Sequence, residues 1–189
     1  MDIKEQKKEI RKSVKALKNS TPQQERDACS LSIQQKLLST GIFEQAGTIL
    51  LYHALPDEVN TELLLSTLSN RRGGNKKIIL PVVEGEYLIL KEYVPQEMEC
   101  GYRNISEPTG SVQTDPSEIE LAIIPGVAFD KCCNRMGRGK GFYDRLIPYL
   151  KCPTIGLGFG FQMVENIPCE EFDKPLDMVV TEIDTYKRG

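Results

Sequence analysis

The sequence lacks the residue patterns that mark several common classes of protein. It contains one histidine, His53, and its six cysteines include no Cys-x-x-Cys pair, so the usual ligand spacings of a zinc site are missing. A membrane-spanning helix needs about 18 consecutive apolar residues, and no apolar run in the sequence is nearly that long. The charged start "MDIKEQKKEIRK" does not resemble a secretory signal. We therefore expect no membrane association, a cytoplasmic location and free thiols.

A net positive charge is also missing. The formal net charge of the 189 residues is −3, whereas a general nucleic-acid-binding protein is usually basic. The length and the 40% share of hydrophobic residues are those of one soluble domain that spans residues 1–189. Any cluster of cationic residues is then a local patch on a mildly acidic protein, which suits a small anionic ligand.

Two helices are predicted before the first strand. An apolar stripe with spacings of seven, four and three residues indicates the first helix, and it consists of Ile3, Ile10, Val14 and Leu17. Thr21 is the expected N-cap of the second helix, with Pro22 at its first position and Gln24 as the capping-box partner. That helix is expected to stop near Gly41.

Strands and helices alternate through the rest of the chain. The expected strands are residues 48–52, 77–83, 87–94, 121–125, 154–160 and 176–182, with helices over 61–69 and 141–150 and a polar loop over 95–117. Alternation of this kind indicates an α/β domain with a mostly parallel sheet. The hairpin near Gly85 makes the expected sheet mixed.

The segment "RMGRGKGFYDR", residues 135–145, combines alternate glycines with cationic side chains. It follows the strand "LAIIP", and ligands of such sheets bind beyond the carboxyl ends of strands. Glycines allow close backbone approach to an anion, while Arg135, Arg138 and Lys140 offer charged donors. Asp144 beside them suits Mg²⁺ bound together with phosphate oxygens.

The spacing of the glycines matches neither the Walker A loop nor the dinucleotide fingerprint. Spacing alone leaves two readings, a phosphate-binding loop or a basic turn with a glycine C-cap.

The longer stretch "PGVAFDKCCNRMGRGKGFYDR" resembles the signature of the 5-formyltetrahydrofolate cyclo-ligase family, whose members are also called methenyltetrahydrofolate synthetases. Met136 stands where that family usually has leucine, and Phe142 where it has tyrosine. Three further stretches, "KKEIR", "LPDEVNT" and "LDMVVTE", resemble other family segments, so the resemblance extends over most of the chain.

The resemblance implies a three-layer α/β/α fold and an ATP-dependent ring closure. In that reaction 5-formyltetrahydrofolate and ATP give 5,10-methenyltetrahydrofolate, ADP and phosphate, through a phosphorylated formyl group. The implied partners are these small molecules with Mg²⁺, and neither nucleic acid nor a membrane. The family resemblance also favours a monomer.

The resemblance assigns roles residue by residue. Arg138 and Lys140 are the expected catalytic residues, and Asp144 and Asp177 the expected Mg²⁺ ligands. The expected ATP-binding residues are Lys7, Lys8, Glu9, Ile10, Arg11, Arg135, Met136, Gly137, Arg138, Gly139, Lys140, Gly141, Phe142 and Tyr143. The expected substrate-binding residues are Arg11, His53, Glu58, Tyr102, Arg138, Gly139, Lys140, Gly141 and Phe142.

Each residue also has a plainer interpretation. Lys7 and Arg11 can be solvated charges of an amphipathic helix, although they lie one turn apart on one face. Glu58 can be a carboxylate near a helix N-terminus, and Asp177 a solvated strand-end residue. We expect His53 to form part of a pocket wall, Gln162 to lie within reach of a ligand, and Arg145 to be a helix-surface arginine.

Three functions remain open from the sequence. The first is the folate cyclo-ligase. The second is a related ATP-dependent enzyme that activates a different amide or carbonyl substrate. The third is a protein that binds a nucleotide or folate without turnover, against which two expected metal ligands argue, since metal ligands matter more to phosphoryl transfer than to retention. Cys132 and Cys133 are taken as structural or incidental thiols.

Overall fold

A computed structural model describes residues 2–69, 76–101, 106–110 and 112–189. Its centre is a seven-stranded sheet with the order β11-β10-β9-β6-β1-β2-β3. The strands are β1 (Thr48–Leu50), β2 (Lys77–Glu84), β3 (Tyr87–Glu92), β6 (Leu121–Pro125), β9 (Thr154–Leu157), β10 (Met178–Val180) and β11 (Thr185–Lys187). Neighbours among β1, β2, β6, β9 and β10 are parallel, and the edge strands β3 and β11 are antiparallel to theirs. The expected mostly parallel, mixed sheet is confirmed.

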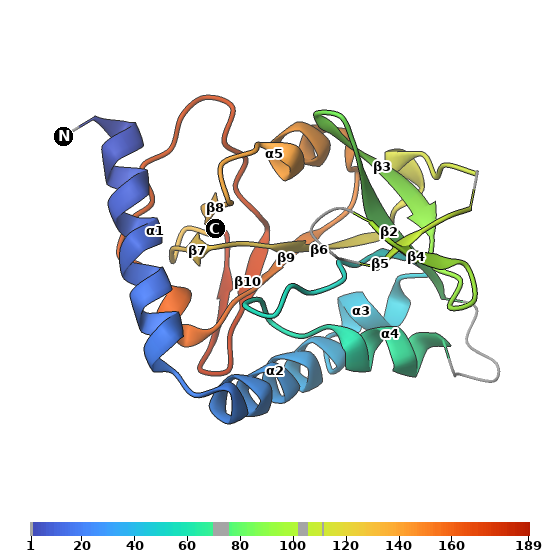
Figure 1. The fold of residues 1–189 in the computed structure, drawn as a ribbon, viewed down its shortest axis with the longest axis horizontal. Coiled ribbons are helices and arrows are strands. Elements are labelled where there is room, and N and C mark those ends of the chain that lie inside the picture. The colour runs from blue at the N-terminus through green and yellow to red at the C-terminus, as the bar shows by residue number, and fades with distance from the viewer. Residues whose placement is uncertain (1, 70–75, 102–105, 111) are drawn as a thin grey trace.

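Helices cover the two faces of this sheet unequally (Figure 1). One face packs against α2 (Gln23–Leu38), α3 (Gly41–Gln45) and α4 (Glu62–Ser69), whose buried Ile33, Leu37 and Leu64 meet the strands. The other face is covered by α5 (Phe142–Leu146), by a 3-10 turn at Ile147–Tyr149 and by irregular chain. This is the expected three-layer α/β/α arrangement, with one thin layer.

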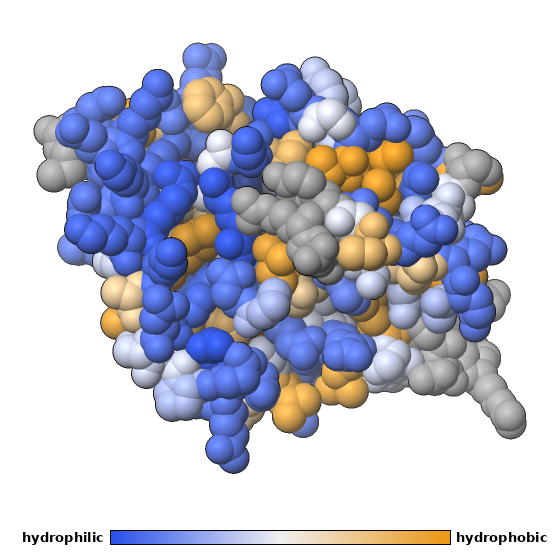
Figure 2. Space-filling view, in the orientation of Figure 1, coloured by the Kyte–Doolittle hydropathy of each residue, from blue (hydrophilic) through white to orange (hydrophobic). Residues whose placement is uncertain are grey.

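Helix α1 (Ile3–Ser20) lies at one end of the molecule instead of in either layer. Its buried Val14 packs against Ala128 and Met136, which belong to the small hairpin of β7 (Ala128–Phe129) and β8 (Arg135–Met136). Hydrophilic side chains gather over α1 in the view of Figure 2. The packing brings the N-terminal helix beside the glycine-rich segment that follows β8.

Several elements differ from the expectations. Thr21 caps the end of α1, with its hydroxyl donating to Leu17 O at 2.9 Å, and Pro22 is the N-cap residue of α2 without a side-chain cap. The expected loop 95–117 contains the antiparallel pair β4 (Met98–Cys100) and β5 (Ser106–Pro108). The expected helix 141–150 ends after five residues and continues as the 3-10 turn. Asn60 accepts from Glu62 N at 2.8 Å at the start of α4.

The strand order contains a topological switch point between β1 and β6. From this point the chain places β2 and β3 on one side and β9, β10 and β11 on the other. In open parallel sheets the crevice at the carboxyl ends of such strands binds ligands. The segments after β1 and β6 are therefore the first place to examine for a site.

Phe129 determines how closely the chain can pack behind that crevice. Its ring is fully buried, and Cβ atoms built at Gly126, Gly156 and Gly158 would lie 2.5, 2.6 and 2.8 Å from ring carbons. Real Cβ atoms essentially never come that close. The three glycines thus allow the β6 and β9 ends to close around one aromatic ring.

Gly156→Ala should therefore destabilise the protein by about 1–3 kcal/mol, because a new methyl group overpacks the Phe129 cage. Urea denaturation measures the change. Gly41→Ala is the matched control, since no atom lies within 4 Å of its Cβ position, and it should leave the unfolding free energy nearly unchanged. Equal midpoints for the two variants would contradict this account of the cage.

Candidate active site

The segment between β6 and the glycine-rich loop is shaped by Asp130. Its carboxylate, 2% exposed, accepts from Cys132 N at 2.9 Å, Asn134 N at 3.0 Å and Ile167 N at 3.0 Å. A buried carboxylate needs several such donors to be stable. The turn that these bonds hold sends the chain back through β8, so that the glycine-rich loop begins beside the carboxyl end of β6. No role for Asp130 was predicted, although it lies within the resembling stretch.

Arg135 lies at the centre of the site and is bound mainly to other parts of the protein. It is 4% exposed; Nη1 donates to Pro125 O at 3.1 Å and Nη2 to Asp144 Oδ1 at 2.8 Å. Its guanidinium also stacks on Tyr143, 5.6 Å from the ring centroid. These contacts turn the charge inward, and the expected phosphate role stays a prediction. Arg135 joins the end of β6 to α5.

The glycine-rich loop takes a conformation that few other residues can adopt. Gly139 has φ of +92° and Gly141 φ of +67°, both in the left-handed region. Arg11 Nε, from α1, donates to Gly137 O at 3.1 Å. The loop is therefore held from the N-terminal helix as well as from its own flanks.

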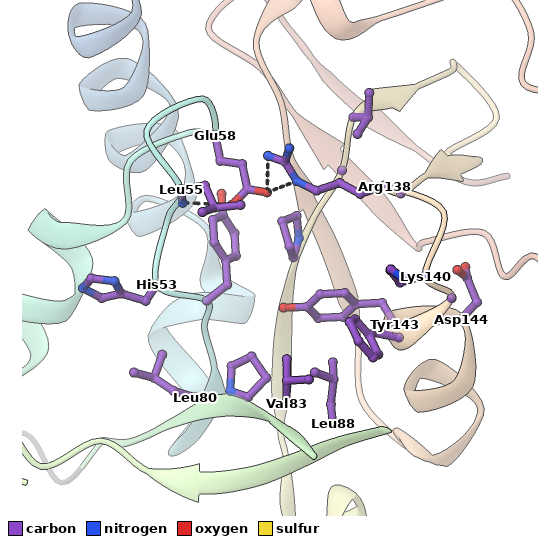
Figure 3. A pocket seen from close by; sticks show the side chains of 18 of the residues that line it. His53, Leu55, Glu58, Leu80, Val83, Leu88, Arg138, Lys140, Tyr143 and Asp144 are labelled. Carbon is purple, nitrogen blue, oxygen red and sulfur yellow. Dashed lines mark hydrogen bonds and ion pairs between the residues drawn. The ribbon is translucent and has the colours of Figure 1, made fainter. Parts of the chain in front are cut away.

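Two cavities meet at this loop. The first, here called the apolar cavity, encloses about 950 Å³ with its mouth (Figure 3) and occupies the switch point, between Tyr52 and His53 after β1 and Pro125 and Gly126 after β6. The second, here called the charged cavity, encloses about 1070 Å³ with its mouth between α1 and the loop. The residues that line both are Gly137, Lys140, Gly141 and Asp144. Two ligands can thus meet at one wall.

The apolar cavity has one polar corner. Glu58 Oε1 accepts from Arg138 Nε at 3.2 Å and Nη2 at 3.0 Å, and Glu58 Oε2 accepts from Leu55 N at 3.1 Å. Asp57 bridges Arg138 Nη2 at 2.5 Å and the buried Lys18 at 3.1 Å. These partners raise the pKa of Arg138 against the opposing effect of its burial. Glu58 and Arg138, each expected to bind the substrate, are brought together, with Asp57 as an unpredicted third member.

Tyr143 faces the same cavity from α5 (Figure 3). Burial, and after it the charge of Glu58, raises the pKa of its hydroxyl. The phenol therefore stays protonated at neutral pH and offers a hydrogen-bond donor. Phe142 lines the same cavity.

The charged cavity contains five cationic side chains and three carboxylates. Lys7 Nζ donates to Glu170 Oε2 at 2.8 Å and Asp173 Oδ2 at 2.6 Å, and it lies 5.7 Å from the centre of the Phe172 ring. An ammonium has three donors, so one remains for a ligand. Of the five expected residues of α1, Lys7 and Arg11 line this cavity. Lys8 and Glu9 are exposed to solvent, and Ile10 packs against the core beside Val14.

Two other expected site residues lie outside the lining of both cavities. Asp177 lies at the amino ends of β9 and β10, where its Oδ2 accepts from Thr154 N and Oγ1, both at 2.8 Å. Thr154 pairs with Ala122, three residues before Pro125, so Asp177 and Asp144 lie at levels roughly 10 Å apart along the strands. One ion cannot bridge them. Gln162 is 1% exposed and donates to Gly126 O at 2.8 Å, which makes it a support of the turn.

The structure places two of the three remaining predicted residues, His53 and Cys133. His53 lines the apolar cavity as expected, but its ring points away from Glu58 and Tyr143 in Figure 3. Cys133 is buried with φ of +61°, in keeping with a structural position. Tyr102 lies outside the described residues.

No helix among the described ranges is long and apolar enough to cross a bilayer. Nor do those ranges contain a group of three His, Cys, Asp or Glu side chains placed to bind one metal ion. A metal at Asp144 would therefore take most of its ligands from elsewhere. Mg²⁺ bound through one carboxylate, phosphate oxygens and water fits that description.

Comparison with known proteins identifies the relatives of this chain. Residues 3–182 match the model of the 5-formyltetrahydrofolate cyclo-ligase family. The Haemophilus influenzae 5-formyltetrahydrofolate cyclo-ligase is 31% identical over 181 residues, 91% of this chain and 95% of that protein. The Escherichia coli K12 enzyme of the same name is 34% identical over 145 residues, 72% of this chain and 78% of its own.

A solved structure extends the comparison to the fold. The structure of Aquifex aeolicus 5,10-methenyltetrahydrofolate synthetase superimposes with a TM-score of 0.85 and 31% identity. The alignment covers 96% of this chain and 92% of that protein.

The Arg135–Asp144 pair gives a test of the site's construction. Asp144→Asn should lower the free energy of unfolding by about 3 kcal/mol, because it leaves the buried guanidinium without its counter-charge. The double variant Arg135→Met, Asp144→Leu should recover much of that loss, as thermal and urea unfolding can measure. Asp2→Asn is the control, at a helix N-cap without a side-chain bond. An Asp144→Asn variant with the parent's free energy of unfolding would show that the Arg135–Asp144 pair is not required for stability.

Proposed function

This chain belongs to the 5-formyltetrahydrofolate cyclo-ligase family, and we propose that it converts 5-formyltetrahydrofolate to 5,10-methenyltetrahydrofolate with consumption of ATP. The observation that carries the proposal is the pair of cavities that share Gly137, Lys140, Gly141 and Asp144. A mostly apolar cavity with the Glu58 carboxylate in its polar corner suits a pterin ring, and a cavity rich in cations suits a triphosphate. ATP, the folate and Mg²⁺ are its proposed partners, and the protein acts as a cytoplasmic monomer.

The formyl group of the substrate needs activation before the ring can close. An N5-formyl group is amide-like, so its carbon is a weak electrophile and its oxygen a poor leaving group. Transfer of the γ-phosphoryl group of ATP to that oxygen releases ADP and leaves an iminium phosphate. N10 then attacks the carbon and loses its proton, and the carbon–oxygen bond breaks to release phosphate. Such a transfer depends mostly on positioning and on neutralising charge.

Lys140 is the cation best placed for this transfer. It lines both cavities and its side chain is exposed, so it can reach a phosphoryl group that passes from one ligand to the other. The amides that follow Gly139 and Gly141 lie in the same loop and can donate to the phosphate oxygens. Mg²⁺ at Asp144 would supply charge neutralisation for the phosphates.

Arg138 must change partners during the reaction. In the structure its Nε and Nη2 donate to Asp57 and Glu58, so only Nη1 faces no carboxylate among the described residues and could meet a phosphate. A pterin that donates to the Glu58 carboxylate competes for the same oxygens. Binding of the folate then releases Arg138, which can neutralise the phosphate formed on the formyl oxygen.

The direct test incubates the purified protein with 5-formyltetrahydrofolate, Mg²⁺ and ATP and follows the absorbance of the methenyl product. The absorbance signal should appear with ATP and not without it.

Lys7→Met should raise the KM for ATP about tenfold, by loss of one charged hydrogen bond. The KM for the folate should change less.

Lys8→Met is the matched control for Lys7→Met. Lys8 is the neighbouring lysine of the same helix, but it is solvent-exposed and absent from the lining of the charged cavity. It should keep the parent KM. Equal effects of the two changes on the KM for ATP would contradict the assignment of ATP to the charged cavity. A wild-type protein that gives no ATP-dependent absorbance signal would refute the proposed activity itself.

Glu58→Gln should act on the two substrates with opposite signs. Loss of the carboxylate weakens folate binding but loosens Arg138, so the affinity for ATP without folate should rise about twofold to fivefold, as expected for a partly exposed ion pair. Isothermal titration with each ligand separately measures both changes. Weaker binding of both ligands would contradict the exchange of partners by Arg138.

A further inference from the structure

Arg145 has contacts that the proposed reaction does not use. The side chain donates from Nε to Glu86 O at 3.0 Å and from Nη2 to Lys140 O at 2.9 Å, with a further short bond from Nη2 to Glu86 O. Its guanidinium carbon lies 5.6 Å from the Tyr87 ring centre and 5.7 Å from the Phe142 ring centre. Arg145 is a partly exposed residue of α5, as expected, but these four contacts hold it more firmly than a plain surface arginine.

The two carbonyl groups belong to different walls of the site. Glu86 lies in the two-residue turn between β2 and β3, and Val83 and Leu88 on either side of that turn line the apolar cavity. Lys140 lines both cavities. The Arg145 guanidinium therefore connects the β2–β3 hairpin, which forms one wall of the apolar cavity, to the loop that separates the two cavities.

The loop residue next to Lys140 depends on the same side chain. Gly141 has φ of +67°, and a Cβ atom there would lie 2.9 Å from Arg145 Nη1. The guanidinium thus packs directly over the Gly141 backbone. A carbonyl that accepts from a fixed cation cannot rotate freely, so the peptide after Lys140 is held in one orientation.

We propose that Arg145 is a positioning residue that fixes the Lys140–Gly141 peptide against the tip of the β2–β3 hairpin. It thereby sets where the Lys140 ammonium lies between the two cavities. This inference rests on the proposed function for its catalytic consequence. Its structural content, the coupling of loop and hairpin, does not depend on that function.

Arginine is required for this arrangement by its shape. A planar guanidinium offers several donors in a fixed fork and can stack on aromatic faces at the same time. An ammonium keeps the charge but not the fork. Arg145→Lys is therefore an informative change, because it retains the cation and most of the side-chain volume while losing the shared contacts.

Arg145→Lys should lower kcat about tenfold to a hundredfold, the size of effect expected when a catalytic group is displaced by about 1 Å. The KM values for ATP and the folate should change much less, since the cavity walls remain. Arg188→Ala, which removes an exposed arginine near the C-terminus, is the control and should match the parent. An unchanged kcat in Arg145→Lys would overturn the proposal.

Chemical rescue separates positioning from a general loss of structure. Arg145→Ala leaves a gap between two carbonyl oxygens and two rings, and millimolar guanidinium should restore part of its kcat. Sodium chloride at the same ionic strength should not. A variant that folds with the parent's thermal midpoint, is slow, and fails to respond to guanidinium would count against the proposal.

Hydrogen exchange provides a readout that needs no activity. In Arg145→Ala the amides of residues 137–142 and of 84–88 should exchange faster together, because one side chain holds both segments. Faster exchange in one segment alone, or in neither, would overturn the coupling. If wild-type protein shows no ATP-dependent cyclisation but the two segments still respond together, the proposed function fails while the coupling stands.

Discussion

A buried guanidinium without a counter-charge costs several kcal/mol, and Arg135 therefore needs Asp144. The pair joins Pro125, the last residue of β6, to the first turn of α5. The segment between Arg135 and α5 is a loop in which two glycines take left-handed conformations. With both ends held, the loop has few conformations left, and its amides and Lys140 keep defined positions between the cavities. A glycine-rich loop by itself would be flexible, and the buried pair is what makes it a fixed wall.

The cations around that wall are mostly bound to carboxylates in the structure. Lys7 contacts Glu170 and Asp173, and Arg138 contacts Asp57 and Glu58. This arrangement avoids unpaired charge in partly dehydrated cavities, and in the proposed reaction it would make ligand binding an exchange of partners. Exchange suits an enzyme with two substrates, since one ligand can take the carboxylate and leave the cation for the other. Lys140, exposed at the boundary, needs no such release.

The elements that were predicted correctly are those with a strong local pattern. The stripe of α1, the continuous apolar run of β6 and the alternation of strands and helices each reflect burial against one core. The missed elements β4, β5 and β11 have three residues each, and they form strands only because a partner strand lies alongside. Thr21 illustrates the same limit at one residue. Its hydroxyl can begin a helix or end one, and the choice of Leu17 O follows from the packing of α1 and α2.

For the candidate site, residue types determined the chemistry and the tertiary structure determined the assignment. Glycines, cations and a carboxylate within eleven residues already indicate an anion site, because few other duties require that combination. Only the folded chain shows that Arg135 is a buried support, that Asp177 lies at the far end of its strand, and that Asp57 and Arg145 take part. Sequence spacing cannot distinguish a charge that faces a ligand from one that faces the protein. That distinction depends on which segments, up to 166 residues apart for Lys7 and Asp173, the sheet brings together.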